Sequence, residues 1–478
     1  HAGGVTVSDV SDEPFLIANG GNHYYINDAS LDGDEYTSAI GDNANSGKDA
    51  AHPMASLAAL LRAYDLDASD VIHVDTGDYT LSTNLVIGAE DSGVSIVGAV
   101  DHASVLDRNN SNTGQYAVQL VGATDVALQH LTLTGGQYGF YVGADSGSHR
   151  FELSDSEITG NSSGGVYVGN NVADGRISGN LIHDTGSTSV YIYYVPRLEI
   201  ADNHIYGGST GIYVYNPRTW DDRVVISGNR VHDYSSTGIS VSYDVEVIGN
   251  EVWGNATGID QGYGVNQGNR VWHNTTGISQ YGGQALDNVV WWNNEGIYSS
   301  SGVVAGNRVY GNSTGIRETE SQVSNNVIWD NTGIGIQMQS GHSGENDGAY
   351  NNTVVQRGGN AIQVDSAARN VLVRDNIFEL VSSVGLYVDP NGEQGFRSDY
   401  NLFNVVDANL AYWEEDYYLE GDRLSWMFDT GNDVHSVVGA ANFIDLDGAD
   451  ERFGFDSLNA GAALIVDDGD AGVVLSGA

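Results

Sequence analysis

The chain of 478 residues contains no cysteine, only 5 prolines and a single lysine, Lys48. Without cysteine there is no disulfide framework, no thiolate metal site and no cysteine nucleophile. No apolar run of about 18 residues occurs, so we expect no membrane-spanning segment and no membrane partner. Because the chain opens at His1 without a signal-peptide pattern, we expect a mature or trimmed form.

Positive charge is also scarce. The 18 Lys and Arg residues face 63 Asp and Glu residues, which gives a formal net charge of −45. Such a surface repels nucleic acid and anionic lipid, so neither is expected as a partner. The charge predicts a secreted, extracellular bacterial protein, of the kind found in marine or halophilic bacteria. A merely soluble acidic protein is the alternative.

Glycine is abundant, with 63 residues, and much of it belongs to an internal repeat. The motif Gly-Asn-x-Val/Ile is followed eight or nine residues later by Gly-Ile. Its asparagine recurs at Asn180, Asn203, Asn229, Asn250, Asn269, Asn288, Asn307 and Asn326. A period near twenty residues is too short for helix pairs, and the segments between turns are short, alternating and β-branched. The repeat predicts an all-β solenoid, a parallel β-helix with stacked Asn turns and an inward Ile and Val core.

The repeat also suggests three regions. Residues 54–64 form an amphipathic helical pattern just before the first expected strands, where a solenoid needs a cap. We therefore expect an N-terminal segment with a capping helix over 1–70 and a parallel β-helix over 71–400. Residues 401–478 lose the repeat and are expected to form an irregular C-terminal cap or an arm.

Several segments resemble a known superfamily. The stretches 41–47, 53–57 and 70–79 look like the entry segment of exported pectate-lyase-like right-handed parallel β-helix proteins, and 398–403 resembles their exit segment. The resemblance implies a right-handed coil. The superfamily includes polysaccharide lyases, uronan C5-epimerases, glycoside hydrolases and phage tailspikes, so it does not name one reaction.

The residue after each Gly-Ile is expected to point outward and to stack in a column, and in the N-terminal half this residue is often tyrosine. The tyrosines of this face, in its two outward columns, are Tyr141, Tyr167, Tyr191, Tyr193, Tyr213 and Tyr215. Tyrosines can stack on sugar rings and bond their hydroxyls. The alternative is a ladder that only stabilises neighbouring turns or an oligomer interface.

The loops that follow these strands gather five arginines in an otherwise acidic chain. They are Arg150, Arg176, Arg197, Arg218 and Arg223, with His149 and Trp220 beside them. Arginine binds carboxylates in bidentate fashion, so the cluster predicts an anion site. Pairing of each arginine with a nearby acid such as Asp174, Glu199 or Asp222 is the alternative.

These patterns favour a polysaccharide lyase that cleaves an acidic, uronate-containing glycan by β-elimination. Arg197 and Arg218 would neutralise the uronate carboxylate. Tyr191, Tyr213 and Tyr215, with His149 as a further candidate, would transfer protons. Tyr141, Tyr167, Tyr193, Trp220, Arg150, Arg176 and Arg223 would bind substrate.

Three other functions stay open. A glycoside hydrolase would use two carboxylates, for which Asp260, Glu318 and Glu320 are candidates. A uronan C5-epimerase shares the first step of the lyase reaction. A non-catalytic glycan-binding or adhesion solenoid needs no catalytic residue.

Calcium is the metal that the sequence favours, because oxygen ligands abound and cysteine is absent. Asp42, Asn45 and Asp49 are its weak candidate ligands. No organic cofactor is expected, and self-association into a homo-oligomer stays open.

Overall fold

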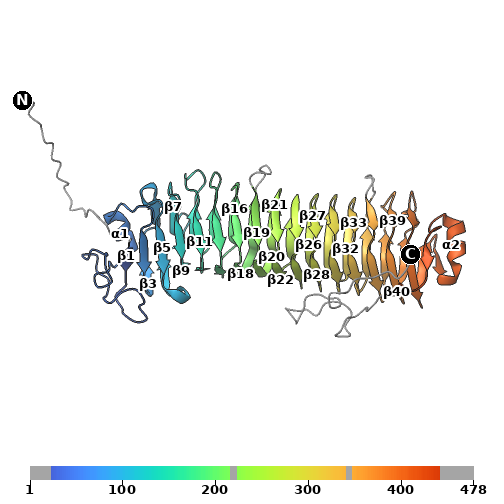
Figure 1. Cartoon of the computed structure of the whole chain (residues 1–478), viewed down its shortest axis with the longest axis horizontal. Coiled ribbons are helices and arrows are strands. Elements are labelled where there is room, and N and C mark those ends of the chain that lie inside the picture. Colours follow the sequence, from blue (N-terminus) through green and yellow to red (C-terminus); the bar gives the residue numbers. More distant parts are fainter. Residues whose placement is uncertain (1–22, 216–222, 341–346, 442–478) are drawn as a thin grey trace, which may run out of the picture. The chain divides into compact units, whose positions relative to one another are not determined.

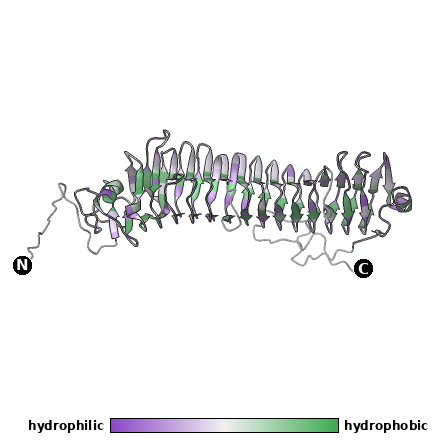
Figure 2. Ribbon diagram, turned by 90° about the horizontal axis from the view of Figure 1, so that it is seen from above, coloured by the Kyte–Doolittle hydropathy of each residue, from purple (hydrophilic) through white to green (hydrophobic). Residues whose placement is uncertain are grey.

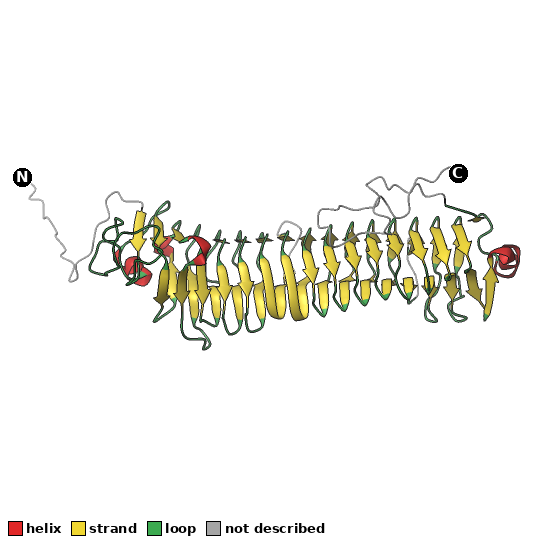
Figure 3. Ribbon diagram, turned by 90° about the horizontal axis from the view of Figure 1, so that it is seen from below, coloured by secondary structure: helices red, strands yellow, loops and turns green. Residues whose placement is uncertain are grey.

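The computed structural model describes residues 23–215, 223–340 and 347–441. The chain divides into two compact units, residues 1–208 and 209–478. Each is a coil of short strands in which one turn, or rung, contributes one strand to each of three parallel rows (Figures 1 and 3). The helices of the described residues are short, and none is long and apolar enough to cross a membrane.

The first unit builds its three rows from consecutive strands. Row 1 contains β1 (His23–Ile26), β2 (Val71–Val74), β5 (Ser95–Gly98), β8 (Ala127–Gln129), β11 (Glu152–Ser154), β14 (Arg176–Ser178) and β17 (Glu199–Ala201). Row 2 contains β3 (Gly77–Thr80), β6 (Ser104–Asp107), β9 (Leu131–Thr134), β12 (Glu157–Thr159), β15 (Leu181–His183) and the start of β18 (His204–Tyr215). Row 3 contains β4 (Leu85–Gly88), β7 (Tyr116–Val121), β10 (Tyr138–Val142), β13 (Gly164–Val168) and β16 (Thr188–Tyr193).

The second unit repeats this arrangement. Row 1 contains β19 (Val224–Ser227), β21 (Val245–Ile248), β24 (Gly264–Gln267), β27 (Gln284–Leu286), β30 (Val303–Ala305), β33 (Gln322–Ser324), β36 (Gly348–Tyr350), β39 (Leu372–Arg374) and β42 (Arg397–Asp399). Row 2 contains the start of β20 (Arg230–Ser242), β22 (Glu251–Trp253), β25 (Arg270–Trp272), β28 (Val289–Trp291), β31 (Arg308–Tyr310), β34 (Val327–Trp329), β37 (Thr353–Gln356), β40 (Ile377–Val381), β43 (Leu402–Val406) and β46 (Val437–Val438). Row 3 contains the end of β20, β23 (Thr257–Gln261), β26 (Thr276–Tyr281), β29 (Glu295–Ser300), β32 (Thr314–Thr319), β35 (Ile334–Met338), β38 (Asn360–Val364), β41 (Val384–Val388) and β44 (Asn409–Trp413), to which β45 (Asp416–Leu419) adds antiparallel.

The core of each unit is a set of apolar columns, and the strands carry most of the hydrophobic colour in Figure 2. In row 3 of the second unit, Ile259, Ile278 and Ile297 occupy matching positions of successive strands and are fully buried. Branched side chains fit this position because a pleated strand holds them in one rotamer against the same residue of the next rung. The predicted parallel β-helix is therefore confirmed.

Buried asparagines form a ladder at the turn between rows 1 and 2. The side-chain oxygen of Asn307 accepts bonds from the backbone nitrogen (2.9 Å) and the side-chain nitrogen (3.0 Å) of Asn288. The side-chain nitrogen of Asn288 also donates to the carbonyl of Asn266 at 3.0 Å. Each asparagine thus satisfies polar groups that the tight turn would otherwise bury without a partner.

The ends of the described chain carry the helices. The helix expected over 54–64 is shorter, α1 (Leu57–Ala63), because Ser56 caps its first turn and Met54 pairs as a β-bridge with Ile26. The segment after 401 continues rows 2 and 3 before it turns into α2 (Arg423–Thr430). The division into regions 1–70, 71–400 and 401–478 stays a prediction.

Replacing Asn288 by alanine should lower the free energy of unfolding by about 2–4 kcal/mol, because it leaves several buried backbone and side-chain groups without partners. Urea unfolding followed by circular dichroism measures this. Asn294→Ala is the matched control, since Asn294 is exposed in the same rung and should change stability by less than about 0.5 kcal/mol. Equal effects of the two substitutions would contradict the ladder.

Candidate functional site

The outward face of row 3 is the surface on which the sequence places its chemistry. In each Gly-Ile pair of the second unit both residues face inward, which turns the next side chain outward, as Gly258 and Ile259 do for Asp260. A Cβ on Gly258 would lie 2.6 Å from the carbonyl oxygen of Gly277, so glycine is required for this close approach between rungs. The residues after Gly-Ile are partners in successive strands, as predicted.

In the first unit this column is a stack of tyrosines. The rings of Tyr141 and Tyr167 are 4.9 Å apart and 15° from parallel, and those of Tyr167 and Tyr191 are 5.4 Å apart and 3° from parallel. Tyr116 also stacks on Tyr141, with ring centroids 3.8 Å apart. The ring faces are therefore turned toward one another, and this arrangement supports the stabilising-ladder interpretation.

Protonation also limits what these tyrosines can do. Burial is the main cause that raises the pKa of Tyr167 and of Tyr191, with neighbouring tyrosines adding to it. Both phenols therefore stay protonated at neutral pH. They can donate hydrogen bonds or protons but are poor bases.

The predicted arginines of the first unit are paired with acids. Arg150 binds both oxygens of Asp125 at 2.6 and 2.7 Å. Arg197 pairs with Asp174, and Arg176 bonds Glu199 at 2.6 Å. Pairing with nearby acids, the alternative considered for these arginines, is thus observed.

The remaining predicted residues are scattered over different contacts. His149 lies in the turn before row 1 and forms β-bridges with Thr124 and Ala173. Tyr193 is partly exposed and packs edge-on against Tyr194, and Tyr215 does the same with Tyr243 in the second unit. Tyr213 lies on β18, and Arg223 pairs with Glu246. Arg218 and Trp220 lie outside the described residues.

The structure adds a hollow in row 3 of the second unit. It has a volume of about 320 Å³ and is lined by Thr257, Thr276, Ser279, Tyr281, Glu295, Tyr298, Arg317 and Gln339. Hydroxyl, phenol and amide groups dominate this lining, which suits a ligand rich in hydroxyl groups.

One ion pair holds the centre of the hollow. The Arg317 guanidinium bonds both carboxylate oxygens of Glu295, whose side chain is only 11% exposed. The same guanidinium lies 5.0 Å from the centroid of the Tyr298 ring. A nearly buried carboxylate needs such a partner, and the cation–π contact fixes the arginine from a second side.

Asp260 lies beside the hollow, on the same strand as Thr257 and in register with Ser279, both of which line it. Burial raises the pKa of Asp260 above its ordinary value, although a hydrogen bond with Ser279 opposes the shift. Row 3 thus carries, two rungs apart, a carboxyl group whose pKa is raised by burial and a carboxylate held by arginine. Unlike environments of this kind separate the roles of two acids.

The sequence indicated Asp260 but missed Glu295. The repeat itself could have indicated Glu295. Thr257, Thr276 and Thr314 occupy the position before Gly-Ile, and Glu295 replaces threonine at that position. The other expected acids lie elsewhere. Glu318 is fully buried and accepts a bond from the backbone of Ser321, and Glu320 lies in an exposed turn.

The candidate calcium ligands are engaged locally. Asp42 accepts from the backbone of Ala44, Asn45 donates to the carbonyl of Pro53, and Asp49 accepts from Ala51. Among the described residues no group of three or more His, Cys, Asp or Glu side chains is placed to hold a metal ion. The structure gives the calcium expectation no support.

A family model described as a right-handed beta helix region matches residues 116–285. The chain is a right-handed parallel β-helix protein. A second model, described as periplasmic copper-binding protein (NosD), matches residues 260–418 of this β-helix. No curated protein matches the chain.

Solved structures similar to the β-helix have low identity. They include the A-module of the mannuronan C-5 epimerase AlgE4 of Azotobacter vinelandii (15% identity, 77% of this chain and 91% of that chain covered, TM-score 0.37). A complex of XylC with xylose (10%, 80% and 86%, TM-score 0.42) and a lacto-N-biosidase of Eubacterium ramulus (13%, 87% and 68%, TM-score 0.29) are others.

Copper does not fit the described residues of 260–418. The soft donors there are limited, since the chain has no cysteine and Met338 is fully buried in the core. His273, the histidine described in this range, stacks on Trp292 with no second histidine beside it. Copper sites draw on imidazole and sulfur ligands, and these described residues do not bring such ligands together.

The Glu295–Arg317 pair should show strong coupling in a double-mutant cycle with Glu295→Gln and Arg317→Gln. We expect a coupling of about 2 kcal/mol in the free energy of unfolding, because the carboxylate is nearly buried. The exposed pair Asp125–Arg150 is the control and should give less than about 1 kcal/mol. Similar coupling in both pairs would show that Glu295 is not held as described.

Proposed function

We propose that the protein is a carbohydrate-active enzyme that cleaves glycosidic bonds of a polysaccharide bound on the outward face of row 3 in the second unit. The observation that carries the proposal is the polar hollow at Glu295 and Arg317, with Asp260, whose pKa is raised by burial, two rungs from Glu295 on the same row. The lining can bond sugar hydroxyls through threonine, serine, tyrosine and glutamine side chains.

Asp260 is the proposed proton donor. Cleavage of a glycosidic bond leaves an oxygen that must gain a proton, and a raised pKa keeps a carboxyl group able to donate one to higher pH than an ordinary aspartate. The ion pair of Glu295 and Arg317 would fix the sugar through hydrogen bonds and stabilise positive charge at the sugar ring through the carboxylate.

Hydrolysis is the reaction that this site favours. Elimination from a uronate needs a cation that neutralises the substrate carboxylate, so Arg317 would have to exchange Glu295 for the substrate, whereas in hydrolysis the ion pair can stay intact. Hydrolysis needs only the acid, a carboxylate and water.

β-Elimination on an acidic glycan is the second candidate. Arg317 lies in the hollow beside Tyr281 and Tyr298, so an arginine and two phenols face the same space. A uronate carboxylate that displaced Glu295 would bind Arg317 and lie near both phenols. This version transfers the predicted lyase chemistry from the first unit to the second. A net charge of −45 also supports a protein that acts outside the cytoplasm.

Incubation with alginate, pectate, glycosaminoglycans and neutral glycans tests the proposal. We expect new reducing ends without ultraviolet absorbance for hydrolysis, and an unsaturated uronate chromophore for elimination. Deuterium uptake without cleavage would identify an epimerase instead. Unchanged glycans throughout would favour a binding or adhesion protein and contradict the proposal.

Asp260→Asn should lower kcat/KM at least about 100-fold, because the amide cannot donate the carboxyl proton. Asp287→Asn is the control, since Asp287 is exposed in a turn between rows 1 and 2. Full activity of the Asp260→Asn variant would refute the assignment. Both variants should unfold at the same urea concentration as the natural chain.

Activity should fall as the pH rises through the raised pKa of Asp260, because the proton-donating form is then lost. The residual activity of Asp260→Asn should lack this alkaline decline. A pH profile of kcat/KM for both proteins measures the difference. An identical decline in the variant would assign it to another group.

A further inference from the structure

A second hollow lies on row 1 near the end of the described chain. Its volume is about 230 Å³, and its lining includes Leu372, Arg374, Arg397, Asp399 and Tyr400. It opens on the row formed by β39 and β42, whereas the hollow at Glu295 opens on row 3. The two hollows therefore belong to different rows of the same unit.

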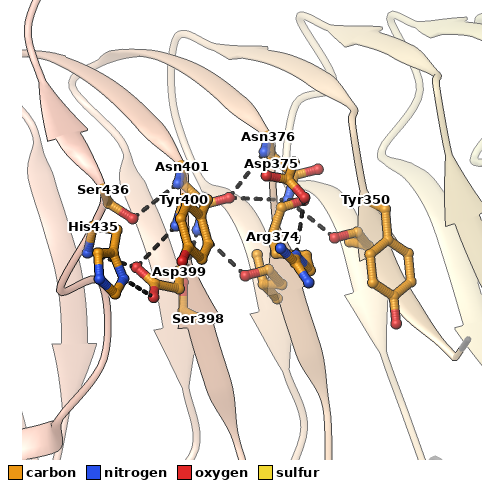
Figure 4. Close-up of polar contacts among 12 residues, drawn as sticks. Tyr350, Arg374, Asp375, Asn376, Ser398, Asp399, Tyr400, Asn401, His435 and Ser436 are labelled. Atoms are coloured by element: carbon orange, nitrogen blue, oxygen red, sulfur yellow. Dashed lines mark hydrogen bonds and ion pairs between the residues drawn. The ribbon is translucent and has the colours of Figure 1, made fainter. Parts of the chain in front are cut away.

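A layered stack of side chains forms one wall of this hollow. The Tyr400 ring stacks on His435, with centroids 4.8 Å apart and planes 8° from parallel. The Arg374 guanidinium lies 5.3 Å from the Tyr400 centroid. Figure 4 shows these residues on neighbouring turns, with Tyr350 farther along.

Each acid that faces this stack already has a partner. Asp399 accepts from the backbone nitrogen and the Nδ1 atom of His435, both at 2.7 Å, and Asp375 bonds Arg374 at 2.9 Å. Desolvation of Asp399 is outweighed by its hydrogen bonds from His435 and Tyr400, so its pKa lies below the ordinary value and the carboxylate stays charged.

Arg397 differs from these residues. It is exposed on β42, and within the described part of the chain it makes no hydrogen bond or ion pair with a carboxylate. The turn ladder of Asn376, Asn401 and Ser436 is bonded through its own backbone and side-chain groups, without the Arg397 guanidinium (Figure 4). Because Arg374 is paired with Asp375, Arg397 supplies the guanidinium of this hollow that an anion can pair with, in a chain of net charge −45.

We propose that this hollow binds the carboxylate of a single sugar-acid unit, with Arg397 as the bidentate partner of that carboxylate. Arginine matches carboxylate geometry with two parallel N–H donors. His435 stacks on Tyr400, which lines the hollow, and its Nδ1 atom contacts Asp399, so its imidazole is a local reporter of the site. A volume of about 230 Å³ is below the range of about 300–1,000 Å³ that holds larger ligands, so one monosaccharide unit fits.

The site differs from the proposed cleavage site and does not depend on its chemistry. A uronate chain or its product could be held at this hollow whether the protein cleaves by hydrolysis, by elimination or not at all. Binding is therefore measured on the full chain carrying Asp260→Asn, so that no turnover interferes. Failure of binding here would leave the proposal for Asp260 unaffected.

Isothermal titration with glucuronate, glucose and acetate tests the site. We expect glucuronate to bind more tightly than acetate, and glucose to show no binding that depends on Arg397. Arg397→Gln should weaken glucuronate at least about tenfold, since it removes a charged bidentate partner. Arg62→Gln is the control, because Arg62 is an exposed arginine in the last turn of α1, and it should change nothing.

A local readout accompanies the titration. The imidazole resonance of His435, assigned through His435→Asn, should shift on addition of glucuronate in the Asp260→Asn protein and stay unchanged when Arg397→Gln is added. Unaltered affinity in Arg397→Gln, or glucuronate binding without a shift of His435, would overturn the proposal. Equal binding of glucose and glucuronate would overturn it as well, because recognition would then not involve the carboxylate.

Discussion

The hydrogen-bonded asparagine ladder is the constraint on which each unit depends. A tight turn between rows 1 and 2 buries backbone groups at every rung, and Asn269, Asn288 and Asn307 satisfy them through the same atoms each time. Because the bond pattern repeats, the rungs stay in register. A slip by one residue would move every inward side chain to the outer face.

Register turns a sequence repeat into columns of like side chains. On row 2 of the second unit it stacks Trp253, Trp272 and Trp291, with centroids 4.8 Å apart at each step. On row 3 it places Asp260 beside Ser279. Columns of like residues therefore stabilise the coil. Where one residue differs from the rest of its column, as Glu295 does, the surface gains a distinct polar site.

The sequence allowed the coil, its asparagine turns and its outward columns to be predicted, because each depends on local spacing alone. Val71–Val74 is a strand as expected, and Asp260 lies in the expected column. Contacts between side chains of different rungs were harder to predict from the sequence. The pairing of Arg150 with Asp125 and of Arg317 with Glu295 joins residues of neighbouring rungs that are 25 and 22 residues apart in the sequence. The Arg397 hollow also depends on Tyr400 and His435, where the repeat has been lost.

The central claim is that a glycan binds on row 3 of the second unit with its scissile bond at Asp260. A crystal structure of Asp260→Asn soaked with an oligosaccharide from a glycan that the natural chain cleaves tests it most directly. The account predicts sugar density over β23–β32, with a glycosidic oxygen within hydrogen-bond distance of the residue 260 side chain. Density confined to another row, or to the tyrosine stack of the first unit, would contradict it.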